Sequence, residues 1–517
     1  MSGQERRGNS RENHGRSESF DGQRRNEQGR TRNRGQGGSP RRYSQATPGQ
    51  RKRSADPARL VAFKTLREVS TADAYANLVL PKLIREYRLV RRDAGFATEL
   101  AYGALRGQGL YDAILTTLVD RPLAELDPAI LDALRIGAHQ LLAMRVPKHA
   151  ALDETVSLAR AQIGAGPSGL INAVLRRVSE RSAEDWVQQL TAAADGESAK
   201  LAIEHSHPEW IVRALRGALI AHGRDGSELV DLLAADNAAP VVNLVALPGL
   251  GDLTGALEAG AEAGELLENS ATYKHGDVAR VPGVREGTVR VQDAGSQVMA
   301  RALANVQLPT GGDDRYWLDL CAGPGGKAAL LGAIAVQRDA RLTANEPTAH
   351  RARLVENSLD AVPHDYWMVT EEDGRVYGSE DYAGDYDRIM VDAPCSGLGA
   401  LRRRPESRWR KAPRDIPELT SIQGEMLDAA FNAVRVGGVV GFVTCSPHQA
   451  ETRLVVEDFL KRHTDAQLLD TGAEVSKVMY SSAPAAGHEL GSGTTAQLWP
   501  HVHGTDAMFM ALLTKTA

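Results

Sequence analysis

The stretch YWLDLCAGPGGKAALLGAIA, residues 316–335, decides the fold of this chain. A short apolar segment (316–320) leads into a glycine-rich turn (321–327), and the turn leads into residues with high helix propensity. Three more apolar segments follow, separated by helical sequence: RLTANE (341–346), DYDRIMVD (385–392) and GGVVGFVTC (437–445). This alternation predicts a parallel sheet with crossover helices, in which ligands bind at the carboxyl ends of the strands.

The glycine-rich turn predicts a nucleotide-type site. It is not a P-loop, because that motif needs Ser or Thr after its lysine and Lys327 is followed by Ala328. It also lacks the G-x-G-x-x-G spacing of a dinucleotide fingerprint. Glu346 ends the next apolar segment, where a carboxylate can accept both hydroxyls of a ribose. The pattern favours a nucleoside-bearing cofactor, but it does not separate S-adenosylmethionine from other adenosine ligands.

The chain of 517 residues has three cysteines, Cys321, Cys395 and Cys445. Their spacing fits neither a disulfide framework nor a zinc site, so no metal is expected. An isolated cysteine is more often a small buried side chain than a reactive one. If Asp392 and Cys445 end neighbouring strands, however, Cys395 and Cys445 face one pocket. A thiolate is the nucleophile that methylation at C5 of cytosine requires, and Asp392 could hydrogen-bond the N3/N4 edge of the base.

The motifs LDLCAGPGGK (318–327), DAPCSG (392–397) and TCS (444–446) resemble those of the bacterial small-subunit ribosomal RNA cytosine-5 methyltransferases of the Fmu/Sun type. The resemblance covers about residues 55 to 515 and implies a Rossmann-like methyltransferase domain. Upstream segments are similar to that family's NusB-like RNA-binding domain: 93–106, 134–142, 146–156 and 171–177. Ala328 stands where the family commonly has threonine, and Glu346 where aspartate is more usual.

The resemblance also implies roles for individual residues. Cys445 would be the nucleophile and Cys395 would assist release of the product, with Asp392 and Lys327 completing the catalytic set. Without the resemblance the choice of nucleophile stays open, since DNA cytosine methyltransferases use the cysteine of the P-C motif. The implied contacts to S-adenosylmethionine are Cys321, Ala322, Gly323, Pro324, Gly325, Gly326, Lys327, Glu346, Asp373 and Asp392. Asp373 precedes a glycine, and such a pair is often only a turn.

Four parts are expected along the chain: a disordered basic arm (1–54), an all-helical NusB-like RNA-binding domain (55–185), a small α+β connecting region (200–300) and the catalytic domain (301–517). The arm carries fourteen Lys and Arg against five Asp and Glu and almost no apolar residues, so it suits either an RNA-binding or a solubilising tail. Helix starts are predicted at Asp56-Pro57 and Asp127-Pro128, each an N-cap followed by proline.

A basic segment with one tryptophan, 401–413, follows Cys395 and is predicted to bind RNA. Its candidate contacts are Arg402, Arg403, Arg404, Arg408, Trp409 and Arg410. The simpler interpretation is a charged surface loop. The substrate is expected to be small-subunit (16S) rRNA, with tRNA or a non-catalytic RNA-binding assembly factor as the alternatives. The chain has no apolar run long enough to cross a membrane and starts without a signal sequence, so a cytoplasmic protein is expected.

Overall fold

The computed structural model describes residues 55–274, 276–309, 312–481, 490 and 494–517. The predicted basic arm (1–54) lies outside the described residues. Within the described ranges, no helix is long and apolar enough to cross a membrane.

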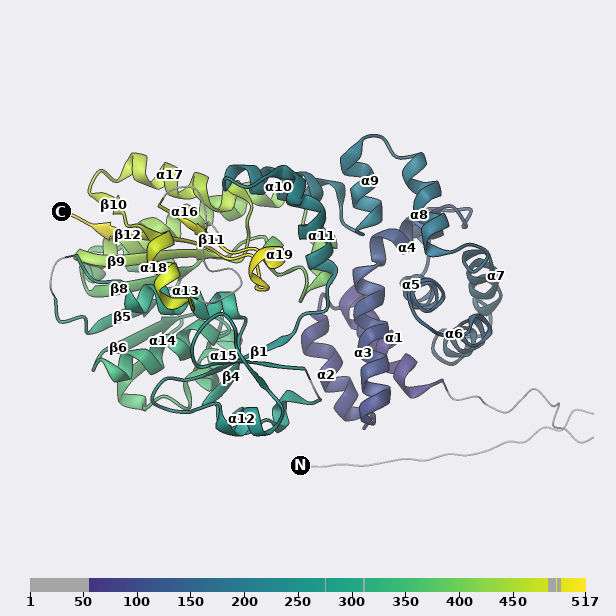
Figure 1. The fold of residues 1–517 in the computed structure, drawn as a ribbon, viewed down its shortest axis with the longest axis horizontal. Helices are drawn as coiled ribbons and strands as arrows, with labels where there is room; N and C mark the ends of the chain where they lie inside the picture. Colours follow the sequence, from purple (N-terminus) through teal and green to yellow (C-terminus); the bar gives the residue numbers. More distant parts are fainter. Residues whose placement is uncertain (1–54, 275, 310–311, 482–489, 491–493) are drawn as a thin grey trace, which may run out of the picture. The chain divides into compact units, whose positions relative to one another are not determined.

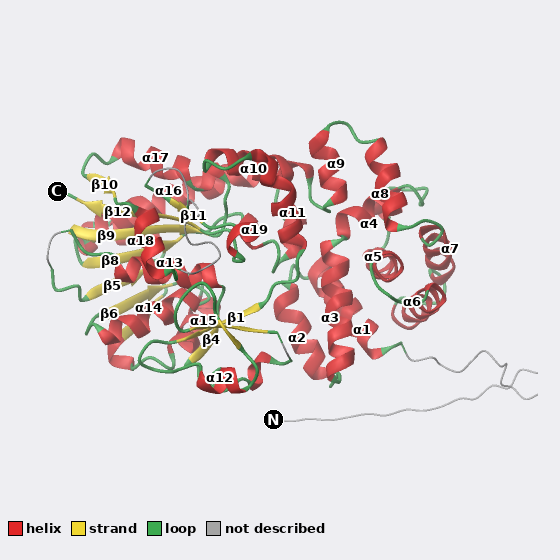
Figure 2. Ribbon diagram, viewed as in Figure 1, coloured by secondary structure: helices red, strands yellow, loops and turns green. Residues whose placement is uncertain are grey.

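The first part of the described chain is helical (Figure 2). Both predicted caps are confirmed, because Asp56 accepts the N–H of Arg59 and Asp127 accepts that of Ala129. One apolar core, which includes Phe63, joins α1 to α8. The helices are α1 (Pro57–Thr71), α2 (Ala76–Glu86), α3 (Arg91–Arg106), α4 (Gln108–Thr116), α5 (Pro128–Leu142), α6 (Lys148–Gln162), α7 (Ser168–Val178), α8 (Ala183–Ala192), α9 (Glu197–Glu204), α10 (Glu209–Ala221) and α11 (Leu229–Asn237). The predicted domain limit at residue 185 falls inside α8.

A small antiparallel sheet follows α11, in the strand order β2-β3-β1-β4. Its elements are β1 (Val242–Ala246), α12 (Thr254–Glu258), β2 (Glu262–Ala263), β3 (Ser270–Tyr273) and β4 (Val289–Val291). This α+β region matches the architecture expected between the helical and catalytic parts. Helices α10 and α11 contribute to a separate apolar cluster that also contains Leu398, Leu401 and Trp499 of the catalytic part.

The catalytic part is built on a larger sheet with the strand order β10-β12-β9-β8-β5-β6-β7, and β11 pairs with β12 (Figure 1). Strands β9, β8, β5, β6 and β7 are parallel, whereas β12 runs antiparallel to β9. The elements are α13 (Ala294–Asn305), β5 (Tyr316–Asp319), α14 (Gly326–Gln337), β6 (Arg341–Asn345), α15 (Ala349–Leu359), β7 (Trp367–Thr370), β8 (Tyr386–Asp392), α16 (Ile416–Ala433), β9 (Val434–Thr444), α17 (Arg453–Arg462), β10 (Ala466–Leu468), α18 (Thr471–Val478), β11 (Ala496–Gln497), α19 (Pro500–His503) and β12 (Phe509–Lys515).

Apolar side chains on both faces explain why these strands read as continuous apolar runs. Trp317 packs into the core beneath α13, α14 and α15, whereas its neighbour Leu318 packs into the core beneath α16 and α17. The same alternation separates Met390 from Val391. The chain order reverses between β5 and β8, since β6 and β7 lie beyond β5 while β9 lies beyond β8. Such a switch point is where α/β sheets bind their ligands. The Rossmann-like prediction for this part is confirmed.

Candidate active site

The glycine-rich turn lies directly after β5, at the switch point. Gly325 has a φ of 103°, in the left-handed region that favours glycine, and it precedes the first residue of α14. Gly323 faces Glu346, because a Cβ at Gly323 would lie 2.1 Å from the Glu346 Oε2 atom. Glu346 is buried after β6 and pairs with Arg351 at 3.1 Å. The turn, the start of α14 and this carboxylate therefore form one cradle of backbone N–H groups and acceptors.

Asp319, the last residue of β5, is a further candidate that sequence reasoning missed. Its side chain is fully buried, and the Cys321 backbone N–H contributes a hydrogen bond to its carboxylate that is too poor in geometry to satisfy either oxygen. Burial, together with the charge of Asp392, raises the pKa of Asp319 to about 7. A buried acceptor that is left unsatisfied is costly unless a ligand completes it. The signal in the sequence that could have identified Asp319 is its position at the end of an apolar segment, directly before the glycine-rich turn.

Lys327 and Asp392 form an ion pair beside the turn. The Lys327 Nζ atom donates to Asp392 Oδ2 at 2.8 Å, which links the first turn of α14 to the end of β8. Burial disfavours the ammonium, but the charge of Asp392 and its hydrogen bond outweigh this effect and raise the pKa of Lys327. Lys327 therefore stays protonated, held at the neighbouring strand.

Cys395 and Cys445 meet at the ends of β8 and β9, which are adjacent strands, so the condition under which both cysteines face one pocket is met. Their Sγ atoms lie 3.3 Å apart, and both side chains are partly buried. The hydrogen bond from Cys395 lowers the pKa of the Cys445 thiol, and the Lys327 charge acts in the same direction. The same bond, with burial, raises the pKa of Cys395. The geometry therefore favours a thiolate at Cys445 and a protonated thiol at Cys395.

Comparison with known proteins identifies both the helical part and the part that carries the large sheet. The family model of the 16S rRNA methyltransferase RsmB/F matches residues 306–514, and the NusB family model matches residues 56–180. The ribosomal RNA small subunit methyltransferase B of Erwinia tasmaniensis is 32% identical over 429 residues, which are 80% of this chain and 92% of that protein.

The chain belongs to the RsmB/F methyltransferase family.

One further relative supports this placement, and one solved structure shares the fold. A Mycobacterium tuberculosis protein whose name assigns it to the methyltransferases is 45% identical over 471 residues, covering 90% of this chain and 98% of that protein. The solved structure of PH0851 has the same fold, with a TM-score of 0.74 at 20% identity over 89% of this chain and 99% of that one. The RsmB/F methyltransferase described here acts on RNA, and its methyl donor is S-adenosylmethionine. The unsatisfied Asp319 carboxylate and the close approach of Gly323 to Glu346 fit a site for that donor.

Asp373 lies at the same edge of the sheet, after β7, but its side chain is already engaged. It caps the 3₁₀ helix η5 (Gly374–Gly378) by accepting the N–H of Arg375 at 3.0 Å. The Arg375 guanidinium also binds it at 2.5 Å, and these hydrogen bonds lower the pKa of Asp373 to about 2. The exposed Asp373 side chain therefore has a local structural partner, and its contact with the methyl donor stays a prediction.

The segment predicted to bind RNA starts beside the thiols. Arg402 is 7% exposed and binds Asp293 at 2.7 Å and Asp506 at 3.1 Å. Arg403 is partly exposed and also pairs with Asp506. The charges of Asp506 and Asp293, and after them that of Cys445, raise the pKa of Arg403, so this guanidinium lies near the Cys445 thiol. Of the two arginines, Arg403 has the exposure that contact with RNA requires.

The rest of that segment contacts the helical part of the methyltransferase. Arg408 is fully buried and donates to the Asp236 carbonyl at 2.8 Å and to Asn237 Oδ1 at 2.8 Å. Arg410 donates to the Ala74 carbonyl, and the Arg404 guanidinium lies 4.6 Å above the Tyr75 ring. Trp409 is 36% exposed, with its ring against Gly109 of α4. These side chains join distant parts of the chain, and their contact with RNA stays a prediction.

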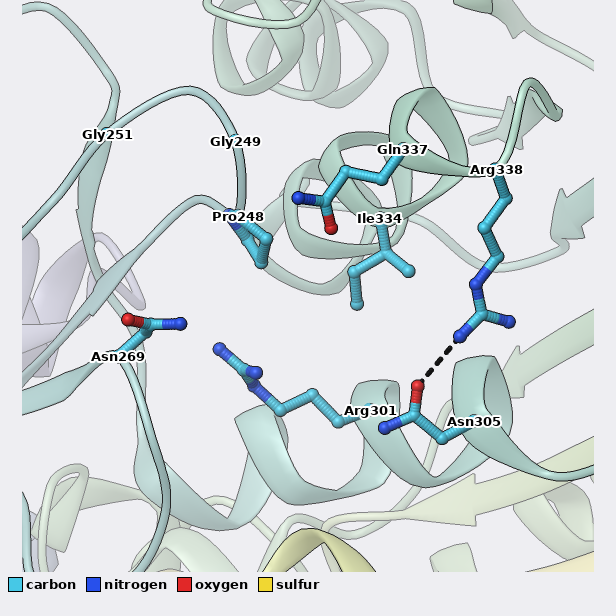
Figure 3. A pocket seen from close by; sticks show the side chains of 9 residues that line it. All are labelled: Pro248, Gly249, Gly251, Asn269, Arg301, Asn305, Ile334, Gln337 and Arg338. Carbon is cyan, nitrogen blue, oxygen red and sulfur yellow. Dashed lines mark hydrogen bonds between the residues drawn. The ribbon is translucent and has the colours of Figure 1, made fainter.

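A polar pocket of about 340 Å³ lies elsewhere, between the connecting region and the carboxyl ends of α13 and α14. Figure 3 shows Arg301 reaching across it toward Asn269, while Arg338 bonds Asn305. No cysteine lines it, and Gln337 and Arg338 are at the opposite end of α14 from the glycine turn. The pocket is therefore separate from the thiols. Among the described residues there is no cluster of three or more His, Cys, Asp or Glu that could hold a metal ion.

Proposed function

We propose that this RNA methyltransferase forms 5-methylcytosine in small-subunit (16S) rRNA in the cytoplasm, with Cys445 as the nucleophile. The observation that carries the proposal is the 3.3 Å separation of the Cys395 and Cys445 Sγ atoms at the ends of β8 and β9, next to the switch point of the sheet. A single thiol at a strand end is compatible with many roles. Here two thiols lie beside the site for the methyl donor, and the pKa of Cys445 is lowered whereas that of Cys395 is raised. Such a pair suits a reaction that needs first a nucleophile and then a proton acceptor.

The reaction begins with attack by the Cys445 thiolate on C6 of the cytosine. The new S–C6 bond displaces the electrons of the C5–C6 double bond toward C5 and the N3/N4 edge of the ring. Asp392, held by Lys327, can accept a hydrogen bond from that edge and orient the base. The cytosine must leave its stack for this attack, so the substrate is a single-stranded or loop region.

S-adenosylmethionine, when bound beside the thiols, would supply its methyl group to the nucleophilic C5 carbon and leave as S-adenosylhomocysteine. The product still carries the S–C6 bond and a proton on C5. Cys395, which gives up its own proton to solvent after Cys445 has been consumed, takes the C5 proton. The electrons of the C5–H bond restore the double bond and expel the Cys445 thiolate. This sequence uses one thiol for attack and the other for release.

Two measurements test the proposal. Labelled methyl groups should pass to 16S rRNA with the parent protein and not with Cys445→Ala, and the label should be found in 5-methylcytosine. Bisulfite sequencing of a strain that lacks the gene should show one 16S cytosine that has become sensitive to deamination. If a tRNA cytosine becomes sensitive to deamination instead, the substrate is that tRNA and not 16S rRNA. Undiminished transfer by Cys445→Ala would refute the nucleophile assignment.

A further inference from the structure

A buried carboxylate lies behind the two cysteines and has no role in the steps above. Glu451, in the 3₁₀ helix η10 (Gln449–Glu451), is fully buried. It comes six residues after Cys445, in a stretch without a recognisable motif. A buried carboxylate is rare unless its oxygens are hydrogen-bonded, so its partners identify its role.

Those partners are the two serines that directly follow the two cysteines. Glu451 Oε1 accepts the backbone N–H of Ser396 at 2.6 Å. Glu451 Oε2 accepts the Ser446 hydroxyl at 2.7 Å and also the Ser396 hydroxyl. The two hydroxyl oxygens lie 3.1 Å from each other. One carboxylate thus binds both strand-end loops next to their thiols.

Gln423 on α16 completes the arrangement from the other side. Its amide nitrogen donates to the Pro394 carbonyl at 2.9 Å and approaches Glu451 Oε1 at 3.4 Å. The loop after β8 is therefore fixed on both sides of Cys395, at Pro394 and at Ser396. A shift of about 1 Å in a reacting group costs on the order of 100-fold in rate, so such a fixed spacing has kinetic value.

We propose that Glu451 is a positioning residue that holds the Cys395 and Cys445 thiols in contact. The inference rests on the proposed function for its meaning in catalysis, but the contact itself can be tested without it. Glu451 also places a negative charge near Cys395, one of the causes that raise the pKa of that thiol. The other charged groups near the thiol pair are Lys327, Asp392, Asp506 and Arg403, which the variants below leave unchanged.

Phenylarsine oxide measures the contact, because a trivalent arsenical binds tightly only when two thiols are close together. In the full-length protein we expect capture of one arsenical, followed by intact mass, and its loss in Cys445→Ala. Glu451→Ala should weaken capture about tenfold or more, because the two loops lose their common acceptor. Glu457→Gln, a partly exposed glutamate on α17, is the matched control and should behave as the parent. Capture by Glu451→Ala at parental affinity overturns the proposal.

Glu451→Gln keeps the test decisive if the alanine variant does not fold. Its amide can still bridge the two serines, so arsenical capture should persist, while loss of the negative charge should move the pH midpoint of Cys395 alkylation downward. If Glu451→Gln folds and its arsenical capture falls as far as that of Glu451→Ala, the bridge between the two serines does not hold the thiols in contact, and the proposal is overturned. Methyl transfer by Glu451→Ala should fall about 100-fold in kcat with little change in KM for RNA. If the parent transfers no methyl group to cytosine, the proposed function fails while the arsenical result still decides on Glu451.

Discussion

Lys327 donates a 2.8 Å hydrogen bond to Asp392 across the switch point of the sheet, and the charges of both residues act on the Cys445 thiol. Lys327 lies in the first turn of α14, which helps to form the cradle for the methyl donor, and Asp392 ends β8, next to the two thiols. The two charges act on the thiol in opposite directions, since Asp392 raises the pKa of Cys445 and Lys327 lowers it.

Replacing Lys327 by Met should remove the positive charge that lowers the pKa of Cys445. We expect the pKa of Cys445 to rise, because the Asp392 charge is then left without its partner, and kcat for methyl transfer to fall about 100- to 1000-fold. The measurement is the rate of Cys445 alkylation by iodoacetamide against pH, with peptide mass spectrometry to assign the site. Lys477→Met on the exposed side of α18 is the control. A Cys445 midpoint that stays in place would contradict the assigned role of Lys327.

Replacing Cys395 by Ala should stop the reaction after methyl transfer. Because Cys445 can still attack C6 but the C5 proton has no acceptor, the protein should remain covalently bound to its RNA. A band of protein plus RNA on a denaturing gel, dependent on S-adenosylmethionine, is the expected result. The double variant with Cys445→Ala should show no such band. Normal turnover by Cys395→Ala would remove its release role.

The fold was largely accessible from the sequence because its signals are local. Proline after an N-cap marked two helix starts, and the apolar runs 316–320, 385–392 and 437–445 contain the strands β5, β8 and much of β9. The neighbouring position of β8 and β9, on which the thiol pair depends, was only a condition of the sequence argument, and the structure supplies it. A motif that spans a strand and its following turn keeps its meaning without knowledge of the tertiary structure.

The partners of buried charged residues could not be predicted in this way. Arg408 looks like part of a solvated basic segment, yet its acceptors Asp236 and Asn237 are more than 170 residues earlier in the chain. Arg402 is likewise bound by Asp293, 109 residues away. Burying a charge is costly without such partners, so a run of arginines is expected to be exposed until the fold supplies them. Glu451 was missed for the same reason, because its serine partners become adjacent only when β8 and β9 pair.

Replacing Arg408 by Ala should destabilise the protein. Four acceptors lose their donor, among them the carbonyls of Ser206 and Asp236, and the buried Asp236 carboxylate loses the positive charge that lowers its pKa most. Removal of one partner of a buried ionic contact costs about 3–5 kcal/mol. Urea unfolding followed by circular dichroism measures this cost, and Arg414→Ala, 89% exposed at its side chain, should stay within about 0.5 kcal/mol of the parent. If the two variants were equally stable, the contacts of Arg408 with Asp236 and Asn237 would contribute nothing to stability.

The pH dependence of stability should reveal Asp236, which is buried without a hydrogen bond to its carboxylate from the described residues. Burial raises its pKa from 3.8 to about 7, so the folded state binds this proton more tightly than the unfolded chain does. The contribution of Asp236 to stability is therefore greatest at low pH and is lost as the pH rises from about 4 to about 7. The Nε2 atom of His207 lies 3.7 Å from Asp236 Oδ2, and burial lowers the pKa of His207 well below 6.5. The contribution of His207 to stability therefore increases with pH, opposite to that of Asp236.

Asp236→Asn removes only the contribution of Asp236. The stability of the variant relative to the parent should grow across this window and level off above pH 7, as measured by urea unfolding at each pH. The exposed Asp195→Asn is the control, and profiles of Asp236→Asn and parent that run parallel would contradict the assignment.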